Sequence, residues 1–138
     1  MTTVGPKPRR LRDDERGSAT AELVIATPVL LLLILLIAQF ALYMHATHIA
    51  QAAASQALSA TRVHGGTTAA GNGEAQRILS QLGSGSLQET AVETHRGSTQ
   101  ASIAITGNTT SILPFIRLTV HAEAVGPVEE FLAEGEPR

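Results

Sequence analysis

The chain contains one long hydrophobic segment. From Leu23 to Met44, 22 residues, there is no charged side chain, and Thr27 and Gln39 stand out as polar positions. A helix of that length rises about 1.5 Å per residue and measures roughly 33 Å, enough to cross a hydrocarbon core of about 30 Å. The pattern predicts a single membrane-spanning helix.

Two other interpretations of the segment are weaker. A secretory signal peptide has an apolar stretch of only about 7–15 residues, although residues 52–54 resemble a small-residue cleavage site. A buried helix of a soluble protein would have to be enclosed on all sides. The chain has few bulky residues for that, with three Phe, one Tyr and no Trp.

Positive charge is concentrated before the hydrophobic segment. Half of the ten Lys and Arg residues lie in the first sixteen positions: Lys7, Arg9, Arg10, Arg12 and Arg16. Only Arg62 follows the segment within about 20 residues. Basic flanks stay in the cytoplasm, so we expect a cytoplasmic N-terminus and an extracytoplasmic C-terminal part, anchored in the cell membrane by one pass.

Helix-favouring residues continue past the membrane segment. After Met44 no Gly or Pro occurs before Gly65, which predicts one helix over residues 18–63. Its outer half carries alanines at steps of 4, 3, 4 and 3, which keeps their methyl groups on one face. These are Ala46, Ala50, Ala53, Ala57 and Ala60. The stripe packs either against another copy or a homologous helix, or against the chain's own domain.

The remainder of the chain predicts a small β-rich domain. Residues 64–86 read as a loop over Thr67–Gly73 and a short helix over Glu74–Leu82. Within residues 87–126, strands are expected at 90–95, 101–106 and 116–124, with turns at 96–98 and 107–111. Gly126-Pro127 should end the last strand, and residues 127–138 form an acidic tail.

These elements predict an α+β, membrane-anchored protein. The alternation in the strands indicates an antiparallel sheet with one wet face, whose dry face lies on the outer part of the long helix. The part after residue 63 has 75 residues and two Phe, so it should be only marginally stable alone.

The composition of the chain argues against several classes of function. The net charge of −2 gives no basic surface for nucleic acid, and the absence of Cys excludes disulfides and thiolate chemistry. His45 and His48 have a metal-ligand spacing, but no Asp, Glu or Cys lies near them in that helix, so we expect no metal site. No other pattern indicates a cofactor, a small-molecule substrate or enzymatic activity.

A short constellation precedes the hydrophobic segment. Glu22 is a carboxylate at its edge, where such residues are either functional or simply hydrated at a helix N-terminus. Cleavage after Gly17 would discard the basic residues 1–17 and make Ser18 the new N-terminus, with Glu22 its fifth residue. Glycine gives a protease an unobstructed approach to the backbone. The new amine, with a reference pKa of about 7.7–8.0, could pair with Glu22 inside an apolar bundle.

These residues resemble those of a known group. A basic arm, Gly17, four small residues, Glu22 and a membrane-length apolar run are typical of type IV prepilins and pseudopilins. With Pro28 in the apolar run and an Ala/Gln-rich helix after it, the fuller resemblance is to TadE-like proteins of the tight-adherence (Flp) pilus system. Relatives often have an aromatic residue after the glutamate, where this chain has Leu23.

The resemblance implies a pilin-like fold and a minor, non-enzymatic component of pilus assembly. It implies cleavage by a prepilin peptidase after Gly17, and partners among other pilin or pilin-like subunits that bind through helix packing. Two alternatives stay open: an uncleaved single-pass anchor that displays a small extracytoplasmic binding domain, and a secreted enzyme released near Ala54.

Overall fold

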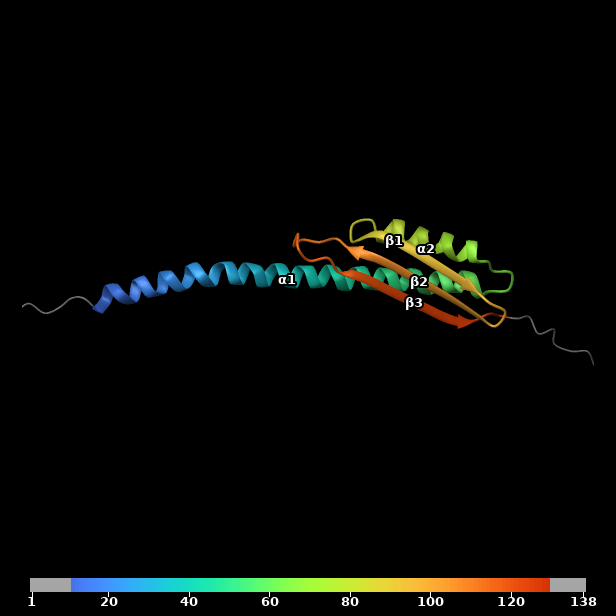
Figure 1. Cartoon of the computed structure of the whole chain (residues 1–138), viewed down its shortest axis with the longest axis horizontal. Helices are drawn as coiled ribbons and strands as arrows, with labels where there is room; N and C mark the ends of the chain where they lie inside the picture. Colours follow the sequence, from blue (N-terminus) through green and yellow to red (C-terminus); the bar gives the residue numbers. More distant parts are fainter. Residues whose placement is uncertain (1–10, 130–138) are drawn as a thin grey trace, which may run out of the picture. The chain divides into compact units, whose positions relative to one another are not determined.

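A computed structural model describes residues 11–129 of the chain (Figure 1). The chain divides into two compact units, residues 1–37 and 38–138, which are described separately. The first ten residues of the expected leader, and most of the acidic tail, lie outside the described residues.

Helix α1, Leu11–Arg62, contributes to both units. It begins before the expected Ser18 and ends next to Val63. Pro28 lies inside it, and the adjacent Thr27 hydroxyl donates a hydrogen bond to the Leu23 carbonyl at 2.7 Å. In the first unit the large apolar side chains of α1 are exposed. Of the helices in the described part, one, Ala19–Arg62, is long and apolar enough to cross a membrane.

Helix α2, Thr68–Leu82, is longer than the sequence predicts. The prediction of a loop over Thr67–Gly73 was wrong, because Thr67 is an N-cap whose hydroxyl accepts a hydrogen bond from the Ala70 amide at 3.0 Å. The two glycines in this stretch do not break the helix, and Gly71 is buried.

Three antiparallel strands form a sheet in the order β1-β2-β3: β1 Leu87–Arg96, β2 Gln100–Thr109 and β3 Thr119–Pro127. A long N-terminal apolar helix combined with this small antiparallel sheet confirms the predicted α+β fold class.

The strand limits differ from those expected. β2 continues through Gly107, where a turn was predicted, because Gly107 faces the core against the Leu87 side chain. β3 starts at Thr119 rather than Ile116. It ends at Pro127, so Gly126-Pro127 closes the strand as expected, and a proline is tolerated at this position because β3 is an edge strand.

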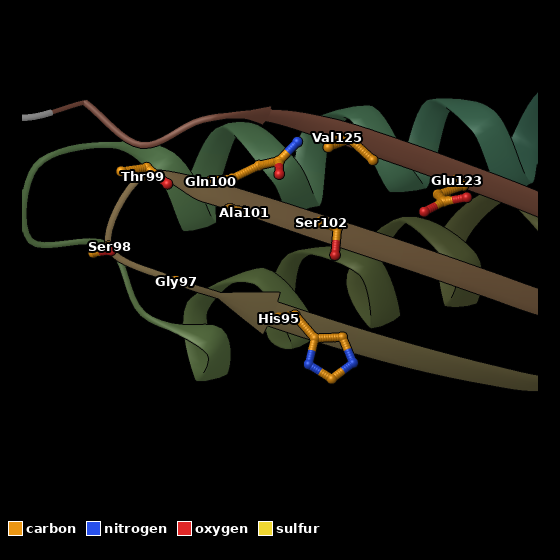
Figure 2. Close-up of a pocket in the computed structure, with 9 residues that line it drawn as sticks. All are labelled: His95, Gly97, Ser98, Thr99, Gln100, Ala101, Ser102, Glu123 and Val125. Atoms are coloured by element: carbon orange, nitrogen blue, oxygen red, sulfur yellow. The ribbon is translucent and has the colours of Figure 1, made fainter.

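The core of the second unit lies between the sheet and the two helices. Both helices cover the same face of the sheet, as Figure 2 shows behind the strands. Alternate residues of β2 and β3 point inward, among them Ile103, Ile105 and Val120, which are at most 1% exposed. They join one hydrophobic cluster with alanines of α1 and with Ala75, Ile78 and Leu79 of α2. The opposite face of the sheet has no covering layer among the described residues.

Candidate functional site

The residues of the expected cleavage motif all lie on α1. Gly17 is exposed, and no atom lies within 4 Å of a β-carbon built on it. The Ser18 side chain lies outside the described residues. Since a helix turns 100° per residue, Gly17 and Glu22 are about 140° apart around the axis. A protein that reads both residues must therefore reach around the helix or unwind it.

Glu22 stands at the edge of the exposed apolar surface. Its side chain is exposed, and it makes neither an ion pair nor a side-chain hydrogen bond with any described residue. Immediately after it, Leu23 is 65% exposed and Val24 69% exposed. A carboxylate beside such a surface is costly to bury without a partner, so a partner for it would come from a new N-terminus or another molecule.

The predicted membrane segment, residues 23–44, is not uniform. All its Leu, Ile and Val side chains up to Ile37 are exposed. From Ala38 onward the helix belongs to the second unit, where Gln39 is only 2% exposed and Tyr43 packs against the core. Phe40 and Met44 remain exposed. The outer end of the segment is therefore partly covered by the chain's own domain.

The alanine stripe packs inside the second unit. Ala46, Ala50, Ala53 and Ala57 are completely buried in the hydrophobic cluster, and Ala60 is half-buried. The stripe was expected to pack either against another helix or against the chain's own domain. These four methyl groups pack against the chain's own domain. A partner helix therefore has no access to them in this structure.

Gln39 is a feature whose role the sequence does not reveal. Its Oε1 accepts a hydrogen bond from the Ile112 amide at 2.8 Å, and its Nε2 donates to the Thr110 carbonyl at 3.4 Å. Both partners lie in the connection between β2 and β3. The sequence does show one side-chain amide in an apolar run, where an amide without hydrogen bonds is unfavourable. It does not show the partner, Ile112, which lies 73 residues away.

The outer face of the sheet carries polar side chains without a catalytic arrangement. Figure 2 shows His95, Ser102 and Glu123 on three adjacent strands near the β1–β2 turn. None of the hydrogen bonds among the described residues joins these three side chains. His45 and His48 are exposed on α1, and the described residues contain no group of three or more potential metal ligands.

An ion pair lies on the surface of α2. Arg77 donates hydrogen bonds to both carboxylate oxygens of Glu74, at 2.5 and 3.0 Å, one turn earlier on the helix. These bonds lower the pKa of Glu74 below its usual value and raise the pKa of Arg77. Both groups lie on the surface, so the pair contributes little to stability and indicates no site.

Comparison with known families finds a match near the N-terminus of the chain. The family model described as TadE-like protein matches residues 17–58. The matched segment begins at Gly17, includes Glu22 and the exposed apolar helix, and ends within the buried alanine stripe. It confirms the resemblance to TadE-like proteins inferred from these residues. No curated protein and no solved structure matches the chain.

Proposed function

We propose that this protein is a minor pilin-like subunit for assembly of a tight-adherence pilus, cleaved by a prepilin peptidase after Gly17. The TadE-like match implies a protein associated with this pilus system. The observation that carries the finer proposal is the placement of Gly17 and Glu22 on one exposed helix, directly before an exposed apolar surface. The chain itself has no enzymatic activity in this proposal, and the peptidase is a separate protein.

The proposed cleavage changes the charge at the edge of the membrane. Hydrolysis of the peptide bond after Gly17 leaves an α-amino group on Ser18, which is largely cationic near neutral pH. Glu22 lies five residues beyond Gly17 and lacks an ion-pair partner among the described residues. The amine and the carboxylate, of one chain or of neighbouring subunits, neutralise each other when the helices gather in an apolar bundle.

Subunit packing in this proposal uses the exposed part of α1. The four buried alanines are already covered, whereas side chains from Leu23 to Ile37 are free to contact lipid or a neighbouring helix. The basic N-terminal arm keeps that end in the cytoplasm, and the β-rich domain lies outside the membrane.

Intact-mass analysis of the membrane form tests the cleavage. In cells with an active prepilin peptidase, we expect a chain that begins at Ser18. Gly17→Leu should abolish the cleavage without disturbing the fold, because nothing lies within 4 Å of a β-carbon there. Gly73→Leu is the matched control, since its surroundings are equally open, and it should be cleaved normally. Persistence of residues 1–17 in the wild-type membrane form would contradict the proposal.

Neutralising Glu22 tests the role in assembly. Glu22→Gln should insert in the membrane normally but fail to support pilus formation. Glu123→Gln, an equally conservative change at an exposed position on the sheet, should assemble as wild type. If both variants assembled equally well, Glu22 would be an ordinary interfacial residue and the chain an uncleaved or passive anchor.

A further inference from the structure

We propose that the connection between β2 and β3, residues 110–118, inserts into the membrane surface beside α1. This inference rests on the proposed membrane span, but it assigns a second, separate contact with lipid. The partner is the lipid surface on the side of the membrane that carries the β-rich domain.

The connection exposes large apolar side chains. Its sequence from Ser111 to Leu118 is SILPFIRL, in which six of eight residues are apolar. Leu113 is buried, but Phe115 is 76% exposed and Ile112 44% exposed. Phe115 is the most exposed large hydrophobic side chain in the described part of the chain. Water contact at these positions is unfavourable, so they favour an apolar partner.

Hydrogen bonds hold this connection against Gln39 of α1. Gln39 holds it through the Ile112 amide and the Thr110 carbonyl, and Gln39 is only two residues beyond Ile37. Figure 1 shows the connection alongside α1, at the end of the sheet opposite the β1–β2 turn. Within the second unit the connection is therefore held beside Gln39, close in sequence to the end of the apolar run.

The length of the membrane span predicts where Gln39 lies relative to the hydrocarbon core. A hydrocarbon core of about 30 Å takes about 20 helical residues. Counted from Leu23, directly after the Glu22 carboxylate, the core extends to about residue 42. Gln39 and the connection bound to it thus lie at the edge of the hydrocarbon. Binding to a second copy of the chain would not require the connection to lie at the edge of the hydrocarbon. Its position therefore favours lipid as the partner of the exposed side chains.

Part of the backbone of the connection is hydrogen-bonded within the chain. The Thr110 amide donates to the Ser86 carbonyl at 3.0 Å, and the Ile116 amide donates to the Leu113 carbonyl at 3.1 Å. The Ser111 hydroxyl bonds to the Ile116 carbonyl at 2.5 Å, and Pro114 has no amide proton. For the groups that make these bonds, the cost of leaving water is lower.

The charge of the connection suits a phospholipid surface. Arg117 is the one charged residue of the connection and is exposed. A long basic side chain beside an inserted Phe can extend its guanidinium to the anionic phosphates while its methylenes stay in the apolar layer.

Tryptophan fluorescence tests the insertion, because the chain has no Trp of its own. Phe115→Trp, in the full chain reconstituted in vesicles of phosphatidylcholine and phosphatidylglycerol, places a single probe at a position open enough to accept it. Ser98→Trp in the opposite β1–β2 turn is the exposed control, and Ile34→Trp is the control within the span. Lipids brominated near the headgroup or deep in the acyl chain report the depth of each probe.

We expect Phe115→Trp to emit at shorter wavelength than Ser98→Trp and to lose roughly half of its emission with shallow bromines, as for a side chain about 5–10 Å inside the interface. Ile34→Trp should be quenched by deep bromines. Emission of Phe115→Trp like that of Ser98→Trp overturns the inference. So does a blue shift that depends on protein density but not on bromine, which indicates a second copy. If Ile34→Trp is quenched while Phe115→Trp is not, the inference alone fails. If neither is quenched, the membrane anchorage of the proposed function fails with it.

Discussion

Gly71 of α2 lies so close to Thr61 of α1 that a β-carbon on Gly71 would come within 2.0 Å of Thr61 Oγ1. Thr61 cannot easily move, because it is completely buried and its hydroxyl donates to the Ala57 carbonyl at 2.8 Å. Glycine is therefore the residue that lets α2 approach α1. The contact lies about one helical turn before Ala75, a residue that α2 contributes to the core.

Gly71→Ala should destabilise the second unit by about 1–3 kcal/mol, the usual cost of inserting a methyl group into a packed site. Thermal unfolding of the full chain in detergent, followed by circular dichroism, measures the effect. Gly73→Ala is the matched control on the same helix, where nothing lies within 4 Å of the added carbon. It should be stabilising by about 0.5–1 kcal/mol because alanine favours helix. Equal unfolding temperatures for the two variants would show that the close contact does not matter.

Gln39→Leu should cost about 1–3 kcal/mol, because it leaves a backbone amide and a carbonyl of the β2–β3 connection without their partner. Its specific signature is faster hydrogen exchange at the Ile112 amide, which donates to Gln39 Oε1. Gln51→Leu makes the same chemical change at an exposed position of α1 and should leave that exchange rate unchanged. An unaltered Ile112 rate in Gln39→Leu would contradict the structural role of this amide.

The sequence predicts the local elements better than their contacts. Periodicity and propensity locate the long helix and three strands, because these signals are repeated over many neighbouring residues. The motif of Gly17 and Glu22 can also be recognised in the sequence, because its residues are close together. Gln39 is visible as an interruption, but its partner Ile112 is distant in the chain, so neither pattern nor spacing identifies it.

The incorrect loop prediction has a related cause. Residues 67–73 contain two glycines among small residues, a composition typical of a loop. The N-cap Thr67 favours a helix locally, and the space available beside Thr61 makes Gly71 a packing requirement rather than a helix breaker. Tertiary contact thus overrides propensity at this position.

Arg96→Met should loosen the end of α1. The Arg96 guanidinium donates a hydrogen bond to the Thr61 carbonyl, in the last turn of the helix, where a cation also interacts favourably with the helix dipole. Loss of both effects should cost about 1 kcal/mol and reduce the unfolding temperature. His95→Met, the exposed neighbour on the other face of β1, is the control and should have little effect. Similar losses from both variants would argue against a specific cap.

Ala53→Leu distinguishes packing within the chain from packing between subunits. Ala53 is completely buried in the chain's own core, so the larger side chain should destabilise the isolated protein by about 1–3 kcal/mol. Ala52→Leu, one residue away on the exposed side of α1, makes the same substitution and should leave the unfolding temperature nearly unchanged. If the alanine stripe instead contacted another subunit, Ala53→Leu would unfold like wild type when isolated and fail only in assembly. Thermal unfolding of both purified variants in detergent therefore decides which surface the stripe belongs to, before any pilus is examined.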